Sequence, residues 1–153
     1  MEMTDQDKNL LRILQQDASL SNQDLAARAG MSASSCWRRV KAMQDAGIIR
    51  GHVLRVDPGA VGLAFHAMVS VHLQRHDPGV QQDFVNAIMD RPEVLTCVAL
   101  TGGADYNLQV FCTDQAAYYQ FLEDFLFRVP GVNNVRTNLV LKTIKDGTEL
   151  PII

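Results

Sequence analysis

Apolar side chains recur at helical spacing in residues 1–50 and predict three short helices. Leu10, Leu11 and Leu14 form one face of a first helix that Thr4 is suited to begin. Ser21 and Ser32 are the expected N-caps of the second and third helices, and glycines follow the ends of both. Two short helices joined by a tight glycine-containing turn are typical of a helix-turn-helix, whose second helix enters the DNA major groove.

Residues 49–56 alternate between apolar and polar side chains, which predicts a strand that serves as a wing or a linker. Turn-forming residues follow, in the sequence Asp57-Pro58-Gly59 and at Gly62. We therefore expect a domain boundary at about residues 57–63.

The rest of the chain alternates between strand and helix patterns. Strands are predicted over residues 65–73, 94–100, 106–112 and 136–144. Helices are predicted after Asp77-Pro78 and after Asp114, both good N-terminal signals. The order β-α-β-β-α-β is that of a ferredoxin-like unit. Such a unit packs both helices on one face of its sheet, so we expect an apolar opposite face that a second copy covers.

The charge of the chain is uneven. The formal net charge is −3, yet Arg28–Arg55 contains six basic residues and one acidic residue, Asp45. A basic segment within an acidic protein fits phosphate contact by one face. No apolar run approaches the roughly 18 residues of a membrane helix, and no signal peptide is evident, so we expect a cytoplasmic location.

The three cysteines, Cys36, Cys97 and Cys112, form no close pair and no metal-binding spacing, so buried reduced thiols and no metal or other cofactor are expected.

Several short motifs occur in a fixed order between Thr4 and Pro151. They are the helix-turn-helix, Gly47-Ile48-Ile49-Arg50-Gly51, Thr101-Gly102-Gly103-Ala104-Asp105-Tyr106 and Pro130-Gly131-Val132. In this order they resemble the Lrp/AsnC, or feast/famine, family of bacterial transcription regulators. Cys36-Trp37-Arg38-Arg39 and Leu150-Pro151-Ile152 further resemble a branch that includes cysteine-responsive regulators.

The resemblance implies an α+β protein with three parts. These are a (winged) helix-turn-helix domain over residues 1–50, a strand linker or hinge over 51–63, and a ferredoxin-like effector-binding and oligomerisation domain over 64–153. It further implies double-stranded DNA as a partner, homodimers that assemble to octamers, and a bacterial, nucleoid-associated location.

Helical geometry divides the third helix into two faces. Cys36, Val40 and Met43 face inward, which places Arg38 on the opposite side, where it is suited to donate two hydrogen bonds to guanine. Arg39 lies near the boundary, either on DNA or in a structural ion pair, and Trp37 either packs on a neighbouring helix or contacts DNA. The candidate DNA-binding residues are Ser34, Ser35, Trp37, Arg38, Arg39, Lys41 and Arg50.

The turn over residues 101–106 is the candidate effector site. Its two adjacent glycines allow backbone N–H groups to approach a carboxylate, and Asp105 offers a partner for an ammonium group. The alternative is an ordinary hairpin turn that Asp105 caps. The resemblance favours an amino-acid effector, with cysteine, leucine and methionine as candidates, bound where two dimers meet. The candidate residues are Thr101, Gly102, Gly103, Ala104, Asp105 and Tyr106, with Thr137 and Asn138 from the same or an adjacent subunit.

Two other functions compete with regulation by an effector. A small enzyme would use His72 and His76, or Cys97 and Cys112, but no acid, nucleophile or metal set accompanies His72. A DNA-organising protein without an effector would not need the glycine pair and Asp105.

Overall fold

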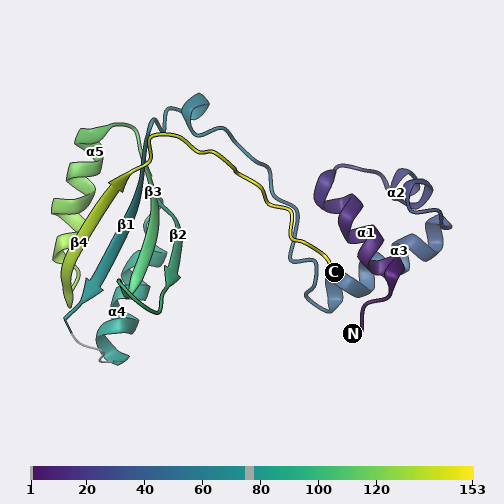
Figure 1. Ribbon diagram of the computed structural model, residues 1–153, viewed down its shortest axis with the longest axis horizontal. Helices are drawn as coiled ribbons and strands as arrows, with labels where there is room; N and C mark the ends of the chain where they lie inside the picture. Colours follow the sequence, from purple (N-terminus) through teal and green to yellow (C-terminus); the bar gives the residue numbers. More distant parts are fainter. Residues whose placement is uncertain (1, 75–77) are drawn as a thin grey trace. The chain divides into compact units, whose positions relative to one another are not determined.

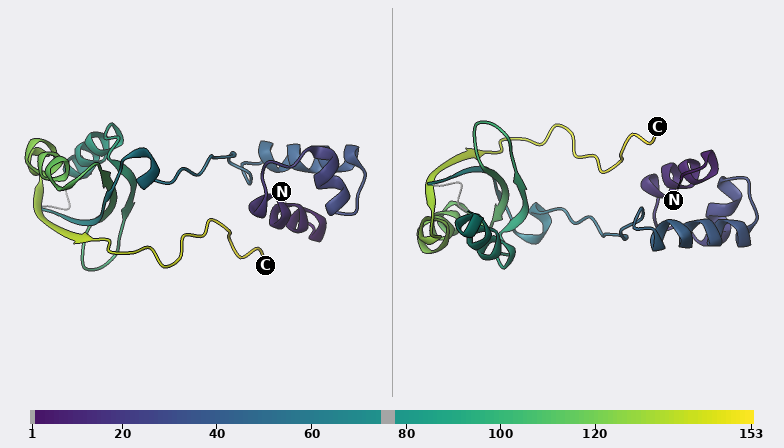
Figure 2. Two further views of the ribbon diagram at one scale, coloured as in Figure 1. Left: turned by 90° about the horizontal axis from the view of Figure 1, so that it is seen from above. Right: turned by 90° about the horizontal axis from the view of Figure 1, so that it is seen from below.

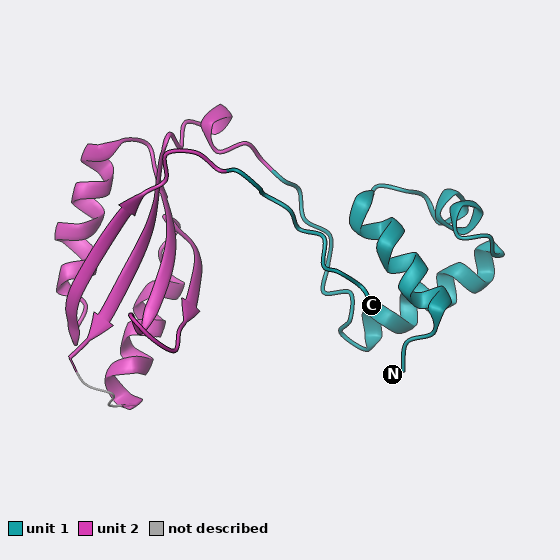
Figure 3. Ribbon diagram, in the orientation of Figure 1, with its two compact units in different colours: residues 1–55, 144–153 teal, residues 56–143 magenta. Residues whose placement is uncertain are grey.

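The computed structural model describes residues 2–74 and 78–153, and the chain forms two compact units (Figures 1 and 3). The first extends to Arg55 and also includes Ile144–Ile153, and the second is Val56–Thr143. The sequence boundaries assigned every residue after 63 to the second domain. The last ten residues instead lie with the first unit, because their contacts are with its first helix, as shown below.

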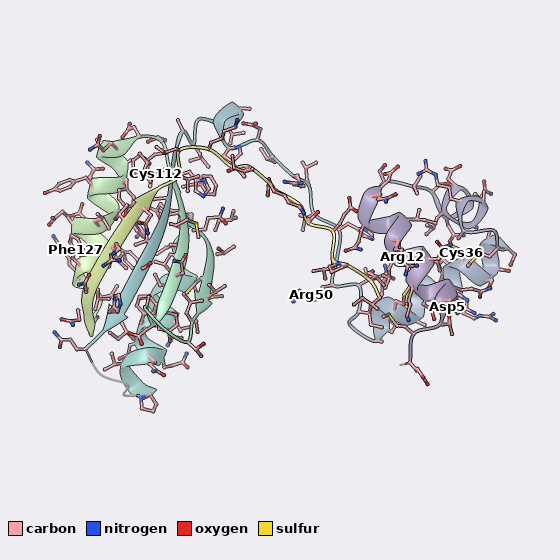
Figure 4. All side chains as sticks on the ribbon, viewed as in Figure 1. Asp5, Arg12, Cys36, Arg50, Cys112 and Phe127 are labelled. Carbon is pink, nitrogen blue, oxygen red and sulfur yellow. The ribbon has the colours of Figure 1, made fainter. Side chains whose placement is uncertain are left out.

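The first unit contains three helices, α1 (Asp5–Gln16), α2 (Asn22–Arg28) and α3 (Ala33–Asp45). The predicted N-caps are confirmed, since the hydroxyls of Thr4, Ser21 and Ser32 each accept a hydrogen bond from a backbone N–H in the first turn. The helices enclose a small apolar core, in which Figure 4 labels Cys36. The buried residues of this core are Leu10, Leu11, Leu25, Ala26, Cys36 and Met43.

Two glycines end α2 and α3 as predicted. Gly30 and Gly47 adopt positive φ angles of 67° and 69°. The Ile48 N–H donates to the Met43 carbonyl at 2.9 Å, and the Met31 N–H donates to the Ala26 carbonyl at 3.0 Å. Both are the six-residue hydrogen bonds of a Schellman motif, which satisfies carbonyls at a helix end. The turn between α2 and α3 is thus set by local sequence.

The prediction of a strand over residues 49–56 is wrong. This segment has no sheet partner, and Val53 and Leu54 are 86% and 88% exposed. Alternation describes a pleated backbone, but a strand also needs a neighbour to pair its N–H and C=O groups. The described residues of the first unit provide none. Instead, Arg55 forms an ion pair with Asp146 of the last ten residues.

The last ten residues attach to α1. The Leu150 N–H donates to Gln15 Oε1 at 2.6 Å, and Gln15 Nε2 donates back to the Leu150 carbonyl at 3.1 Å. Arg12 Nη2 donates to the Ile152 carbonyl at 3.0 Å, and the Ile152 side chain packs against the core of the unit. The chain therefore joins its two units twice, once before β1 and once after the last strand.

Replacing Gln15 with alanine is expected to loosen this attachment. It removes two hydrogen bonds, each contributing about 0.5–1.5 kcal/mol. Cleavage of the last residues by a carboxypeptidase is expected to become faster, and the first unit is expected to unfold at a lower temperature. Gln16→Ala on the exposed side of the same helix is the control. Equal cleavage rates for the two variants would contradict an attachment of the last residues through Gln15.

The second unit is a four-stranded antiparallel sheet with the order β2-β3-β1-β4. Both helices lie on one face of it (Figures 1 and 2). This is the predicted ferredoxin-like topology. The elements are β1 (Phe65–Leu73), α4 (Pro78–Met89), β2 (Val94–Ala99), β3 (Tyr106–Cys112), α5 (Gln115–Gln120) and β4 (Val132–Leu139). α5 continues as a π-helical turn over Phe121–Phe125 and a 3-10 turn over Leu126–Arg128.

The last strand is displaced from its predicted position. β4 begins at Val132 rather than at residue 136, and it ends at Leu139 rather than at 144. Its extent follows from β1, since Val132 pairs with Leu73 and Leu139 pairs with Ala67. The start of β4 was missed because two asparagines follow Val132 and interrupt the alternation of apolar and polar residues. The predicted cap at Asp77 lies outside the described residues.

The two faces of the sheet differ in chemistry. Alternate residues of β1 and β3, including Val69 and Leu108, are buried beneath α4 and α5. The opposite face was expected to be apolar, and this expectation is wrong. His66 stacks on Phe111 with ring centroids 4.1 Å apart, and Asn107 donates to Ser70 at 3.3 Å. A partner on this face would meet side chains capable of hydrogen bonding. No described helix is long and apolar enough to cross a membrane.

Candidate DNA-binding and effector sites

The exposed face of α3 presents the predicted reading residues. Cys36 and Met43 are fully buried, and Ser34, Arg38 and Lys41 on the other side are exposed. Within the described chain, no acidic side chain pairs with Arg38. An unpaired guanidinium on an exposed helix face is available to a base edge or a phosphate.

The first turn of α3 carries hydroxyl groups. Ser32 caps the helix by accepting from the Ser35 N–H at 3.3 Å, and the Ser34 hydroxyl lies 3.3 Å from that of Ser32. Ser34 is exposed and Ser35 is half-buried. Hydroxyls beside the unpaired N–H groups of a helix N-terminus are suited to phosphate contact.

Trp37 is 60% exposed, and it lines a small cavity of about 190 Å³ with Leu25 and Val40. Packing and DNA contact are therefore compatible roles for it.

Two further cations lie beside this face. Lys41 forms an ion pair with Asp45 at 2.8 Å, and both side chains are more than half exposed. An exposed pair of this kind contributes little stability, so Lys41 can exchange Asp45 for a phosphate at small cost. Arg50 follows α3 and points away from the helices of its unit (Figure 4). Both positions suit contacts that hold the protein on DNA without reading sequence.

Arg39 has a different environment from Arg38. Its Nη1 lies 2.9 Å from Asp7 Oδ1 and 3.1 Å from Thr4 Oγ1, and Asp7 is only 1% exposed. Burial alone would raise the pKa of Asp7, but hydrogen bonds from Thr4 and Arg39 together hold that pKa below its usual value. Of the two roles considered for Arg39, the structure favours the structural ion pair with the first helix.

The turn between β2 and β3 exposes a short stretch of backbone. Thr101, Gly102 and Gly103 are exposed, whereas Ala104 and Tyr106 are buried. Gly102 has a φ of 135°, which L-residues rarely adopt. Tyr106 anchors the end of the turn, with its ring 4.7 Å from that of Phe84. The exposed glycine backbone therefore sits on a rigid base.

Asp105 and His72 tie this turn to β1. Asp105 Oδ2 accepts from the Leu73 N–H at 2.8 Å, and the Asp105 N–H donates to the Val71 carbonyl at 3.0 Å. His72 Nε2 lies 2.5 Å from the Gly103 carbonyl oxygen. The capping role considered for Asp105 is thus present. No local sequence pattern connects His72 with the turn, because their contact depends on strand register.

Thr137 and Asn138 do not lie beside the turn within one chain. β1 separates β4 from β3, and Thr137 pairs with Val69 whereas Tyr106 pairs with Val71. The Thr137 hydroxyl lies 2.5 Å from the Tyr118 hydroxyl beneath the sheet. A site that uses the turn and these two residues therefore requires a second copy of the chain.

The residues considered for an enzyme do not come together. His72 contacts backbone, and Cys112 is buried whereas Cys97 is exposed. The expectation of buried thiols is therefore correct for Cys36 and Cys112 and wrong for Cys97. Desolvation raises the pKa of both Cys97 and Cys112, which disfavours the reactive thiolate. No group of three metal-ligating side chains occurs in the described part of the chain, and His76 lies outside it.

Comparison with known proteins identifies both units. A family model for the Lrp/AsnC ligand-binding domain matches residues 66–150, and one for a winged helix-turn-helix DNA-binding domain matches residues 3–50. The DNA-binding transcriptional activator DecR of Escherichia coli K12 is 36% identical over 95% of this chain and 96% of its own length. The leucine-responsive regulatory protein of the same strain is 33% identical over 95% and 89%.

Solved structures agree with this identification. A Neisseria meningitidis transcriptional regulator in complex with L-methionine has a TM-score of 0.93 and 38% identity, covering 98% of this chain and 97% of the other. An AsnC-family regulator from Agrobacterium tumefaciens has a TM-score of 0.91 and 34% identity, covering 97% of both chains. The chain therefore belongs to the Lrp/AsnC family and is a DNA-binding transcription regulator with a ligand-binding domain, not an enzyme.

Proposed function

We propose that this regulator binds DNA as a homodimer or a larger closed assembly up to an octamer, and responds to an amino acid bound at the turn over residues 101–106. The observation that carries the proposal is the exposed glycine backbone of this turn, fixed at its base by Asp105 and Tyr106. In this proposal Ser34, Ser35, Trp37, Arg38, Lys41 and Arg50 contact the DNA, and the protein acts in the bacterial cytoplasm on the nucleoid.

A second copy of the chain would complete the proposed site. Thr137 and Asn138 contribute to the effector site only from another copy, since β1 separates them from the turn in their own chain. The sheet face opposite the helices carries polar side chains that can form hydrogen bonds across an interface, including those of Asn107 and Gln109. In such an assembly the effector would contact two subunits at once.

Methionine is the first effector to test, because a similar regulator was crystallised with L-methionine. Cysteine and leucine follow, the latter because a similar protein is named a leucine-responsive regulator. Either would change DNA binding only as far as it prefers one subunit arrangement over another, a coupling of about 1–3 kcal/mol. The altered spacing of paired α3 helices would then change affinity for two half-sites.

Gly103→Ala tests the turn directly. An added Cβ at Gly103 meets no atom within 4 Å and its φ is not in the left-handed region, so the fold is expected to tolerate the change. The methyl group would obstruct a ligand that approaches the backbone. We therefore expect the melting temperature without ligand to stay unchanged. The apparent affinity for methionine, cysteine or leucine, derived from the increase in melting temperature, should fall at least tenfold.

The matched control is Gly147→Ala, another tolerated glycine replacement far from the turn in sequence and in the other unit. It should respond to amino acids as the wild type does. Binding of the effector to Gly103→Ala with wild-type affinity, measured by calorimetry, would exclude the turn as the site.

A further inference from the structure

The second unit contains a cavity of about 570 Å³ that lies away from the turn over residues 101–106. It opens where β3 ends and α5 begins, near Cys112, which Figure 4 labels at that end of the sheet. The turn lies at the other end of β3. Seven strand residues separate the two, roughly 20 Å. One small ligand cannot occupy both places.

The walls of the cavity combine an apolar surface with charged groups. Leu63, Phe111 and Phe121 supply apolar surface, and Arg91, Glu93 and Asp124 supply one positive and two negative charges. A few polar groups on a mostly apolar wall are typical of pockets for small molecules.

Arg91 and Glu93 form a fixed pair at this wall. Arg91 Nη2 lies 2.9 Å from Glu93 Oε1, and the guanidinium carbon lies 4.3 Å from the centre of the Phe125 ring. Both side chains remain about a third exposed, at 32% and 30%. Arg91 Nε and Glu93 Oε2 nevertheless have no hydrogen-bond partner among the described residues. A buried polar atom without a hydrogen-bond partner is costly. A ligand that supplies a partner to either atom, after a small movement of these side chains, would therefore be favoured.

We propose that this cavity is a second ligand site, for a zwitterion of amino-acid size with an apolar side chain. Its carboxylate would be bound by Arg91 and its ammonium group by Glu93, with Asp124 nearby, while its side chain packs on Phe111 and Phe121. A simple anion at Arg91 would lie beside the Glu93 carboxylate, and a simple cation at Glu93 would lie beside the Arg91 guanidinium. A molecule with both charges matches the wall.

Through Leu63, such a ligand would contact the segment that precedes β1. Leu63 lies between the 3-10 turn Gly59–Val61 and β1, in the segment by which the chain enters the sheet. The Leu63 N–H already donates to the Pro58 carbonyl at 2.8 Å, and a ligand in contact with the Leu63 side chain would add to the contacts that hold this segment. The site does not depend on the proposed role of the turn over residues 101–106.

Ala117→Met tests the site by filling it. Ala117 lines the cavity, and Ala116 beside it is exposed on the same helix, which makes Ala116→Met the matched control. The twenty amino acids are screened singly for an increase in melting temperature of the full-length protein. We expect at least one whose stabilisation is lost in Ala117→Met and kept in both Ala116→Met and Gly103→Ala.

Glu93→Gln provides a test that keeps the shape of the wall and removes the charge that binds the ammonium group. The same amino acid is expected to bind Glu93→Gln at least tenfold more weakly than the wild type, measured by calorimetry. If Ala117→Met does not fold, this measurement alone tests whether the cavity binds the amino acid. The proposal is overturned if no amino acid stabilises the protein, or if every stabilisation survives both replacements. Failure at the turn would appear separately, as the absence of any amino acid whose stabilisation Gly103→Ala removes.

Discussion

Replacing Arg38 with alanine is expected to weaken operator binding by about 1–3 kcal/mol per half-site, roughly 5- to 150-fold, and to leave the melting temperature unchanged. Arg38 is exposed on the side of α3 opposite the buried Cys36 and Met43, so its removal leaves the core intact. Its guanidinium can donate two parallel hydrogen bonds to guanine, a contact that alanine cannot make. A dimer carries the change twice.

The measurement is fluorescence anisotropy with an operator selected from random-sequence DNA and with a scrambled duplex of the same length. Arg38→Ala should reduce the ratio between the two affinities, because a base contact contributes specificity. Arg38→Lys keeps the charge but not the planar fork, so it should lose specificity and retain most non-specific binding.

Lys41→Ala is the contrasting variant for this experiment. It should weaken binding to both duplexes alike and reduce the slope of log affinity against log salt by about 1. A wild-type operator affinity for Arg38→Ala would exclude α3 Arg38 from base recognition.

The features of the fold that were predicted correctly are those encoded by neighbouring residues. Ser32 caps α3, Gly47 ends it and Cys36 faces inward, and each of these depends on side chains within a turn or two of helix. β1 and β3 were also predicted with their observed bounds, because both strands have one fully buried face and therefore alternate clearly.

The features that were missed depend on contacts distant in sequence. Residues 49–56 alternate as a strand does, but they have no neighbour to pair with. The start of β4 at Val132 is set by Leu73 on β1, and the attachment of Leu150 to Gln15 joins residues 135 positions apart. Neither contact leaves a periodic signal, because each is made by single side chains meeting in the folded chain.

The candidate sites divide in the same way. Helical periodicity alone separated Arg38 from the core, whereas only the structure distinguished Arg39, which is held by Asp7. His72 reaches the turn at Gly103 because β1 and β3 are adjacent, and strand order was not accessible from the local pattern. A helix surface is thus more predictable from sequence than a site assembled from several strands.

Asp7→Ala is expected to destabilise the first unit by about 3 kcal/mol, at the lower end of the range for breaking a buried ion pair. The change leaves Arg39 without its carboxylate partner and removes the acceptor that closes the capping box with Thr4. The lower end applies because the Arg39 side chain is 28% exposed and partly reaches water. Urea unfolding of the full-length protein, followed by circular dichroism, measures the effect.

Asp5→Ala is the matched control, since Asp5 is exposed in the same turn of α1. A double-mutant cycle with Arg39→Ala should show that the two losses are not additive, because either replacement already breaks the pair. Arg39→Ala should also retain operator affinity at temperatures where the unit is folded. A loss of affinity as large as that of Arg38→Ala would restore Arg39 to the DNA-contacting residues.

The pH dependence of stability provides an independent test of the Asp7 pair. Hydrogen bonds from Thr4 and Arg39 hold the pKa of Asp7 below its usual value despite burial, so folding favours the charged carboxylate. Its contribution is therefore fully present above the unfolded pKa of about 3.9 and is lost as pH falls through the lower folded pKa. The stability difference between wild type and Asp7→Ala should be constant from pH 7 to about pH 5 and should shrink below about pH 4. A difference that stays constant below pH 4 would mean that the charge of Asp7 does not stabilise the unit, and that its size and packing account for the loss.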